Sequence, residues 1–212
     1  MSKRGQVKDK WRNKKWYTVL TPPYFGNVEV GLIPSDEPEK LIGRVVECTL
    51  YDITEDFAHQ YLKMYFQIVS VEGKQAFTIF KGHEYSRDYL RSLVRRKTTR
   101  VDGILNVTTK DGYRLRVSAC AFTLSRIKTS QEREIRIIMR RIIEEKAVSL
   151  GFDQFVHEAV LGKMASDIYN EAKKIAPLRH VGIRKSKLIS KPSLEPERKI
   201  ELVAEAHAEA VE

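Results

Sequence analysis

Residues 103–124, GILNVTTKDGYRLRVSACAFTL, carry the clearest structural signal of the chain, that of a β-hairpin. Apolar and polar side chains alternate on both sides of Lys110-Asp111-Gly112, the period of two expected of strands with one buried face. An Asp-Gly pair between such strands is the strongest short hairpin signal, because both central positions of the favoured turn need a positive φ. The sequence therefore predicts two antiparallel strands joined at Asp111-Gly112.

Similar alternation extends the predicted sheet toward the N-terminus. Val46, Cys48 and Leu50 share one face of a strand, and residues 62–69 and 75–80 form a second predicted hairpin. Because short turns join these strands, neighbouring strands should be antiparallel. We expect a curved sheet or a small barrel.

The last third of the chain changes to the helical period. Thr129 begins a predicted capping box ahead of an apolar helix face, and Asp153 is expected to cap a second helix that ends at Pro177. An earlier short helix should begin at Ser86, and residues 181–189 form a last predicted strand. The predicted fold class is α+β, an antiparallel β-barrel-like core with flanking C-terminal helices and a flexible basic N-terminal arm.

Composition divides the chain into three predicted parts. Residues 1–15 form a basic arm without an apolar run, which cannot offset its ordering entropy and should be disordered. Residues 16–192 form a single globular domain, since 42% hydrophobic content suffices for a core. Residues 193–212 form an acidic flexible tail, in which Glu201 and Glu205 would repel each other on a helix.

Positive charge is unevenly distributed. The chain has a net charge of +10, but residues 192–212 carry −4, so the other 191 residues carry +14. Such self-repulsion destabilises a free fold, and nucleic-acid phosphates are the natural counter-charge. Four groups of cations lie in the arm, after the second hairpin, on the polar face of the long helix and in the last strand. The predicted RNA-binding residues are Lys3, Arg4, Lys8, Lys10, Arg12, Lys14, Lys15, Arg87, Arg91, Arg95, Arg96, Lys97, Arg100, Arg133, Arg136, Arg140, Arg184, Lys185, Lys187 and Lys191.

The basic residues of the last strand differ from those of the long helix in their sequence neighbours. Arg136 and Arg140 lie within a helical turn of glutamates, whereas Arg184, Lys185 and Lys187 have no acidic neighbour in sequence. We therefore expect the last strand to have the unpaired cations, which are more easily committed to phosphate.

No pattern of a catalytic centre occurs in the sequence. It lacks a glycine-rich phosphate loop, a nucleophile elbow and a His-Glu-x-x-His motif, and its five histidines are scattered. Cys48 and Cys120 form neither a disulfide scaffold nor a zinc site and should be small core residues. We expect no catalytic residue, metal or cofactor. With no membrane span and no secretory signal pattern, the protein should be soluble and cytoplasmic.

Two features leave alternatives open. The acidic residues of segment 52–56 could hold a cation in a metal-dependent RNA-processing enzyme, although loops are commonly acidic. Trp16, Tyr17, Tyr24 and Phe25 could stack on bases, although such clusters more often anchor a strap to the fold. A free-standing basic RNA-binding adaptor is a further alternative.

Five motifs in fixed order give the sequence a family resemblance. They are Lys14-Lys15-Trp16-Tyr17 leading to Pro22 and Phe25, Gly43-Arg44-Val45, Gly82-His83-Glu84-Tyr85-Ser86-Arg87-Asp88, Val107-Thr108-Thr109-Lys110-Asp111-Gly112-Tyr113, and Arg184-Lys185-Ser186-Lys187. With these motifs the sequence resembles, from about residue 10 to residue 192, the small-ribosomal-subunit protein family S-three-a-e (e-S-one) of archaea and eukaryotes.

The resemblance implies a fold, a location and partners. It implies a barrel-like β domain with flanking helices on the platform of the small subunit, near the messenger RNA exit. Its implied partners are small-subunit ribosomal RNA near the 3′ end, neighbouring small-subunit proteins, and messenger RNA and initiation factors near the exit site. The short acidic tail, in place of a long C-terminal extension, resembles archaeal members.

Deletion of residues 1–15 should leave the fold intact and weaken RNA association, because these residues carry charge and almost no apolar surface. If about six phosphates are contacted, the affinity of the full chain should fall roughly a thousandfold or more between about 50 and 200 mM salt. The deletion should flatten that slope. Filter binding over a salt series compares the two chains, and equal slopes would contradict the prediction.

Overall fold

A computed structural model describes Trp11 and residues 14–192 of the protein; the predicted arm, apart from Trp11, Lys14 and Lys15, and the tail lie outside the described residues. The strands are β1 (Lys15–Leu20), β2 (Glu29–Ser35), β3 (Val45–Thr49), β4 (Leu62–Glu72), β5 (Gln75–Tyr85), β6 (Arg100–Thr108), β7 (Arg114–Thr123) and β8 (Leu178–Ser190). The helices are α1 (Tyr51–Thr54), α2 (Arg87–Leu93), α3 (Thr129–Ser149), α4 (Phe152–Val160) and α5 (Lys163–Ala172), with the short 3-10 helices η1 (Pro23–Phe25), η2 (Pro38–Leu41) and η3 (Phe57–His59).

The strands form one sheet that does not close. Its order is β2-β1-β5-β8-β7-β6, and β4 pairs with β3 and β5 beside this path. The α+β class is confirmed, whereas the barrel-like core is not observed: among the described residues β6 pairs only with β7 and so ends the sheet as an edge strand. The pairs are antiparallel except for β1 and β5, which run parallel.

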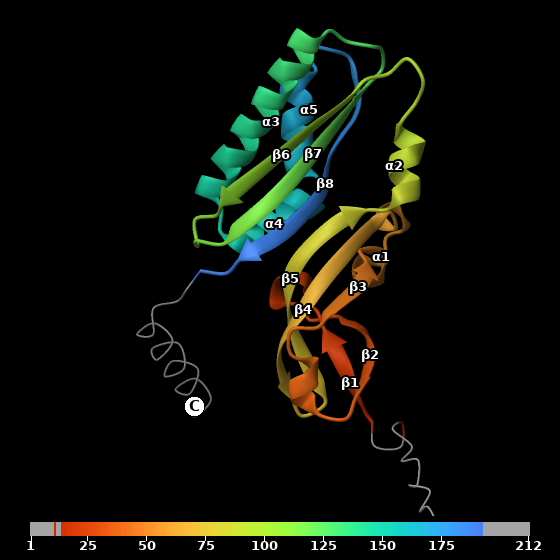
Figure 1. The fold of residues 1–212 in the computed structure, drawn as a ribbon, viewed down its shortest axis with the longest axis vertical. Coiled ribbons are helices and arrows are strands. Elements are labelled where there is room, and N and C mark those ends of the chain that lie inside the picture. The colour runs from red at the N-terminus through yellow and green to blue at the C-terminus, as the bar shows by residue number, and fades with distance from the viewer. Residues whose placement is uncertain (1–10, 12–13, 193–212) are drawn as a thin grey trace, which may run out of the picture.

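Two lobes are connected by β5 (Figure 1). The N-terminal lobe contains β1 to β5, and the C-terminal lobe contains β6 to β8 with α3, α4 and α5. Gln75 to Phe77, at the start of β5, pair with β1, whereas Gly82 to Glu84, near its end, pair with β8. The main hydrophobic core nevertheless spans both lobes, since one cluster contains Phe66 of the first lobe and Ile135 of the second, while a smaller cluster around Tyr17 and Leu41 belongs to the N-terminal lobe.

Glycine is required where β5 meets β8. A Cβ atom at Gly82 would lie 2.3 Å from the carbonyl oxygen of Ser186, which is backbone and cannot move aside. The strands therefore approach more closely at Gly82 than a larger residue would permit.

The predicted hairpin is present with a different turn. Gly112 has φ 80°, but Asp111 is not among the residues with positive φ. The N–H of Gly112 donates to the carbonyl of Thr109, and the N–H of Thr109 donates to the carbonyl of Tyr113, both at 2.9 Å. This is the longer hairpin loop in which only the last residue needs glycine, so the expectation of two positive φ angles was wrong.

Asp111 has a second role, which sequence reasoning assigned to Asp153. Its Oδ2 accepts from the N–H of Phe152 at 2.6 Å and so caps the first turn of α4. The expected single helix after Asp153 is two helices, α4 and α5, broken at Gly162 with φ 83°. The Ser86 cap is confirmed, because its hydroxyl accepts from the N–H of Tyr89 at 3.3 Å.

The long helix α3 also starts differently in detail. The side chain of Gln131, not Glu132, accepts from the backbone N–H of Lys128 at 3.1 Å. Its apolar face is the predicted one: Ile135, Met139 and Ile142 are buried against the sheet. Helices therefore cover one face of β6, β7 and β8 and leave the other face open (Figure 1).

Most of the four aromatic residues that follow the predicted arm in sequence are anchored in the fold. Tyr17 and Phe25 are buried, and the hydroxyl of Tyr24 accepts from the N–H of Phe80 at 3.1 Å. Trp16 differs, with 56% of its surface exposed. The anchoring interpretation therefore describes three of the four aromatic residues, and Trp16 alone remains accessible to a base.

Both cysteines are buried and free, as predicted. Burial raises the pKa of each thiol to about 12, so Cys48 and Cys120 stay protonated near neutral pH. Neither is therefore suited to act as a nucleophile or metal ligand.

Gly82→Ala should destabilise the protein by about 1 to 3 kcal/mol, because the new methyl group overlaps the β8 backbone. Gly31→Ala is the matched control, since a Cβ atom at Gly31 in β2 meets nothing within 4 Å. Urea unfolding measures both. Tryptophan fluorescence reports on Trp11 and Trp16 at the N-terminal lobe, and far-ultraviolet circular dichroism reports largely on α3 to α5. Coincident transitions are expected for one domain; separate ones would contradict a single domain over 16–192.

Candidate nucleic-acid interface

The open face of the sheet carries a row of cations from three strands, β4, β7 and β8. The register places Arg116 of β7 opposite Lys187 of β8, and Lys185 of β8 opposite Glu84 of β5. Glu84 in turn lies opposite Lys63 of β4. We call the following six residues the basic sheet face: Lys63, Arg114, Arg116, Arg184, Lys185 and Lys187.

Strand alternation puts these cations on the outer face, except for Arg184, which precedes Lys185 directly and is the extra residue at a register shift between β7 and β8. In β7, the buried Leu115 and Val117 alternate with the exposed Arg114 and Arg116. In β8, Ser186 and Leu188 are buried and alternate with exposed residues. The inward side chains build the core, so the outward positions are fixed at the strand period of about 6.6 Å.

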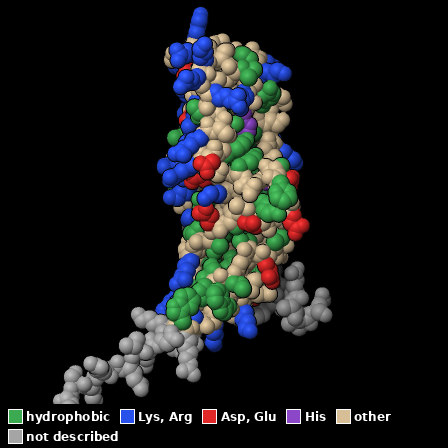
Figure 2. Space-filling view, turned by 90° about the vertical axis from the view of Figure 1, so that its right-hand side faces the viewer, with side chains coloured by type: hydrophobic (Ala, Val, Ile, Leu, Met, Phe, Trp, Pro, Cys, Tyr) green, Lys and Arg blue, Asp and Glu red, His purple; other side chains and the backbone are tan. Residues whose placement is uncertain are grey.

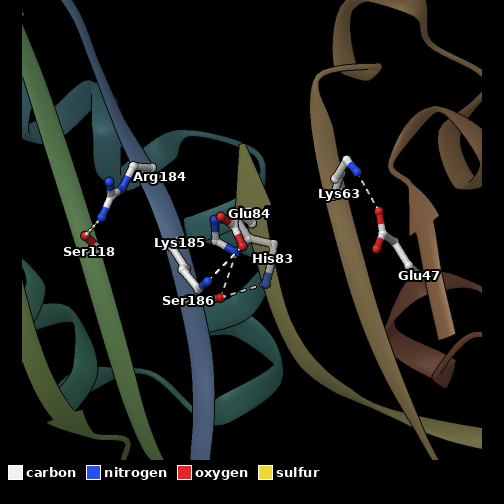
Figure 3. Close-up of polar contacts among 8 residues, drawn as sticks. All are labelled: Glu47, Lys63, His83, Glu84, Ser118, Arg184, Lys185 and Ser186. Carbon is white, nitrogen blue, oxygen red and sulfur yellow. Dashed lines mark hydrogen bonds and ion pairs between the residues drawn. The ribbon is translucent and has the colours of Figure 1, made fainter. Parts of the chain in front are cut away.

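Two carboxylates hold cations in place on this face (Figure 3). The Nζ atom of Lys185 lies 2.8 Å from Oε2 of Glu84, and Nζ of Lys63 lies 2.7 Å from Oε1 of Glu47. The expectation that Lys185 is unpaired was therefore wrong, because Glu84 lies 101 positions away in sequence. Six cations against two carboxylates still leave an excess of positive charge.

The remaining cations of this face have neutral hydrogen-bond partners or form no ion pair within residues 14–192. Arg116 Nε donates to Oδ1 of Asn106 at 2.9 Å, and Arg184 Nη2 donates to the hydroxyl of Ser118 at 3.3 Å. The Nε atom of Arg184 is buried and has no hydrogen-bond partner among the described residues. Arg114 and Lys187 form no ion pair with any described residue. These groups are available to phosphate without loss of an existing salt bridge.

A buried polar pair lies beneath the cations, where β5 meets β8 (Figure 3). The Ser186 hydroxyl lies 2.7 Å from Nδ1 of His83 and accepts from its backbone N–H at 3.2 Å. The Nε2 atom of His83 lies 3.0 Å from the carbonyl oxygen of Ile183. The network assigns the neutral tautomer in which Nε2–H donates to that carbonyl and the serine hydroxyl donates to Nδ1.

The α2 cations adjoin the basic sheet face. A surface cavity of about 500 Å³ is lined by Lys63 and Glu84 of the sheet together with Arg87 and Arg91 of α2. Arg95, Arg96 and Lys97 are exposed in the loop after α2. Figure 2 shows Lys and Arg side chains gathered along one edge of the upper part of the molecule. The structure thus brings two of the predicted groups together.

Other predicted cations lie elsewhere. Arg133, Arg136 and Arg140 line a separate groove between α3 and β6. Arg100 pairs with Asp102 at 2.9 Å. Lys14 and Lys15 begin the N-terminal lobe, where Nζ of Lys14 lies 3.9 Å from the ring centre of Trp11, and Lys191 is exposed after β8. Lys3, Arg4, Lys8, Lys10 and Arg12 lie outside the described residues.

Sequence reasoning missed half of the basic sheet face. Lys63, Arg114 and Arg116 were not among the predicted residues, because none belongs to a run of cations. Their signal was the strand period: a cation between buried apolar neighbours in a predicted strand must point to the opposite face.

The acidic segment of the open alternative has structural roles. Oδ2 of Asp52 accepts from the N–H of Thr49 at 2.8 Å, and Oδ1 of Asp56 accepts from the N–H of Ala58 at 2.9 Å. These carboxylates cap short helical turns. Over the part of the chain that the structure describes, no group of His, Cys, Asp and Glu could hold a metal ion. No helix there is both long and apolar enough to cross a membrane.

An open sheet with helices on one face and clustered cations on the other is typical of a protein that binds a polyanion by its surface. The chain belongs to the Ribosomal S3Ae family, which matches residues 2–192.

Similar archaeal proteins share this family. The protein from Staphylothermus marinus named "Small ribosomal subunit protein eS1" is 52% identical over 189 residues, which is 89% of each chain. Proteins of the same name from Desulfurococcus amylolyticus and Archaeoglobus fulgidus are 51% and 50% identical, over 91% and 89% of this chain and 90% of each relative.

Acid should weaken the β5–β8 connection through His83. Burial lowers the pKa of His83 from its ordinary value of 6.5 to about 4. Between these values the unfolded chain binds the proton and the folded chain does not, so stability falls as the pH falls from 6.5 toward 4. The loss should reach about 3 kcal/mol.

Urea unfolding of the protein and of His83→Gln at several pH values measures this effect. His83→Gln lacks the titrating ring, so the difference in free energy of unfolding between the two chains should shrink on acidification. A difference that stays constant from about pH 7 to pH 4 would contradict the assignment.

Proposed function

We propose that this chain is a structural constituent of the small ribosomal subunit, where it supports translation by holding ribosomal RNA. Its membership of the Ribosomal S3Ae family and the name of its relatives support a structural role in the cytoplasmic ribosome, not an enzymatic one. For the acidic segment 52–56, this favours the capping roles described above over a metal site of an RNA-processing enzyme.

The basic sheet face is the observation that carries the RNA contact. Its cations neutralise phosphates and release counterions, which supplies affinity without reading base identity. Because strand alternation fixes the cations on a sheet, they recognise the shape of the RNA backbone more than its sequence. The α2 cations extend this contact, and the buried Nε atom of Arg184 offers a donor that has no described partner.

The location on the ribosome is a finer part of the proposal. The family resemblance favours the platform near the messenger RNA exit, with ribosomal RNA near its 3′ end as the main partner. Neighbouring small-subunit proteins are further partners, and messenger RNA and initiation factors lie within reach there. Trp16, exposed beside Lys15, is suited to stack on an RNA base at a second contact.

Neutralising Arg114, Arg116 and Lys187 to glutamine should weaken binding to small-subunit ribosomal RNA and lower incorporation into the subunit. The logarithmic salt slope of binding should fall by about 2 to 3, since about three phosphate contacts are removed. The matched control neutralises Lys163, Lys173 and Lys174, which are equally exposed in and after α5 on the helix-covered side.

Filter binding over a salt series measures the slope, and mass spectrometry of purified subunits measures incorporation against the unchanged chain. Equal defects from the two triple variants would show that net charge, and not the sheet face, drives binding. Normal RNA binding together with absence from sedimented subunits would instead select the free-standing adaptor.

A further inference from the structure

The outer edge of β6 presents main-chain groups that no described strand pairs with. The N–H of Thr109, directly after β6, donates to the carbonyl of Tyr113, so the odd-numbered positions of β6 bond to the β7 side. Alternate residues of an antiparallel strand bond to the same neighbour, so the even-numbered residues direct their N–H and C=O groups away from the sheet. Over residues 14–192, the main-chain groups of Ile104 and Asn106 therefore lack a strand partner.

β6 also lacks the features that usually keep a sheet edge from pairing. Its 9 residues exceed the mean strand length of about 5 to 6, and its register with β7 runs from Arg100 to Thr108 without a bulge. It contains neither proline nor lysine, and residues 103–108 carry no charge. By contrast, β2 at the opposite end of the path contains Pro34 and pairs with β1 through a register shift. A regular open edge such as β6 is a template for a further strand.

A groove between this edge and α3 offers room for the side chains of such a strand. It has a volume of about 250 Å³ and is lined by residues 102–105 of β6 and by Arg133, Arg136, Ile137 and Arg140. The four α3 residues are spaced i, i+3, i+4, i+7 and so share one helix face. A Cβ atom at Gly103 would lie 3.4 Å from the sulfur of Met139, so α3 packs closely against β6 and holds this wall of the groove in place.

Two isoleucines give the groove an apolar component. Ile104 is 63% exposed and Ile137 is 58% exposed. Leu105 is buried on the helix-covered side of β6, so strand alternation places Ile104 on the open side of the sheet. Ile137 lies on α3, beside the other side of the edge. An added strand thus meets one isoleucine on each of its two faces.

The α3 wall has more positive charge than its neighbours neutralise. Arg136 pairs with Glu132 at 3.1 Å, and Arg140 lies 4.0 Å from Glu144. Arg133 forms no ion pair with any residue in the described part of the chain. A strand that presents carboxylates toward α3 would complement this excess.

We propose that an extended acidic segment of another protein adds to β6 as a further strand. Its main chain pairs with the open groups of Ile104 and Asn106, and apolar side chains on one face cover Ile104. Acidic side chains on the opposite face meet the α3 arginines around Ile137. RNA fits this edge less well, because its phosphates are acceptors only and leave the β6 carbonyls and both isoleucines uncovered.

This protein contact goes beyond the RNA contact on the sheet face. The added strand lies beside β6, whereas the basic sheet face lies on β4, β7 and β8. The two contacts therefore use different surfaces and can form at the same time. The C-terminal lobe would then join a protein neighbour to the RNA that its sheet face holds.

Peptide titration and amide hydrogen exchange test the proposal on the full chain, without RNA. The probe is the acetylated and amidated peptide Glu-Val-Glu-Ile-Glu-Val-Glu, which alternates acidic and apolar faces. At saturation, the N–H groups of Ile104 and Asn106 should exchange about tenfold more slowly than in the free chain. The amides of β2, at the other end of the sheet path, should be unchanged.

Matched probes and variants separate main-chain pairing from charge. The same peptide with methylated main-chain nitrogens, and a peptide with Lys in place of Glu, should each bind about tenfold more weakly. Arg133→Gln, Arg136→Gln, Arg140→Gln should weaken binding of the acidic peptide by about tenfold. The control Lys163→Gln, Lys173→Gln, Lys174→Gln removes the same charge at exposed positions in and after α5 and should bind normally.

Four results would overturn the proposal. The full chain could fail to bind the acidic peptide, or could bind the methylated peptide equally well, which would exclude strand pairing. Slow exchange of Ile104 and Asn106 in the free protein would assign the edge to another part of the chain or, if the protection depends on protein concentration, to a second copy. Protection of the same two amides by oligouridylate would assign the edge to RNA.

Discussion

The pairing of Gly82–Glu84 with Lys185–Lys187 is the constraint on which the rest of the structure depends. These three residue pairs set the register between β5 and β8, and β5 is the strand that also pairs with β1 and β4. Gly82 allows the two backbones to approach, and His83 and Ser186 satisfy each other's polar atoms in the buried layer. Without this pairing the sheet would separate into two smaller sheets, each with a further open edge.

The same three residues of β8 connect folding to the proposed RNA contact. Ser186 points inward to His83, so Lys185 and Lys187 must point outward on either side of it. Glu84 holds Lys185 at 2.8 Å, a surface pair worth no more than about 1 kcal/mol, whose effect is to fix the direction of the side chain more than to stabilise the fold. The alternation of inward and outward side chains in this short segment thereby determines both the polar contact in the buried layer and the positive charge of the opposite face.

The sequence predicted those features of the fold that depend on residues close together in the chain. The hairpin at Asp111-Gly112, the cap at Ser86 and the apolar face of α3 depend on residues a few positions apart, and each was predictable. The parallel β1–β5 pair, the cap from Asp111 to α4 and the Glu84–Lys185 pair join segments that are distant in sequence, and no local pattern specifies them. Arg114 and Arg116 were predictable in principle, since the strand period alone places them outward.

The two open surfaces of the C-terminal lobe differ in what they can bind, for a geometric reason. On the sheet face, the main-chain groups of β7 and β8 are satisfied within the sheet, so only side chains meet a ligand, and those side chains are mainly cations. At the β6 edge, main-chain N–H and C=O groups point outward as well, and two isoleucines adjoin them. Phosphate offers acceptors only, so it complements the face but leaves the carbonyls and isoleucines of the edge uncovered. A polypeptide strand would complement all three, whereas the cations of the open face suit the proposed RNA contact.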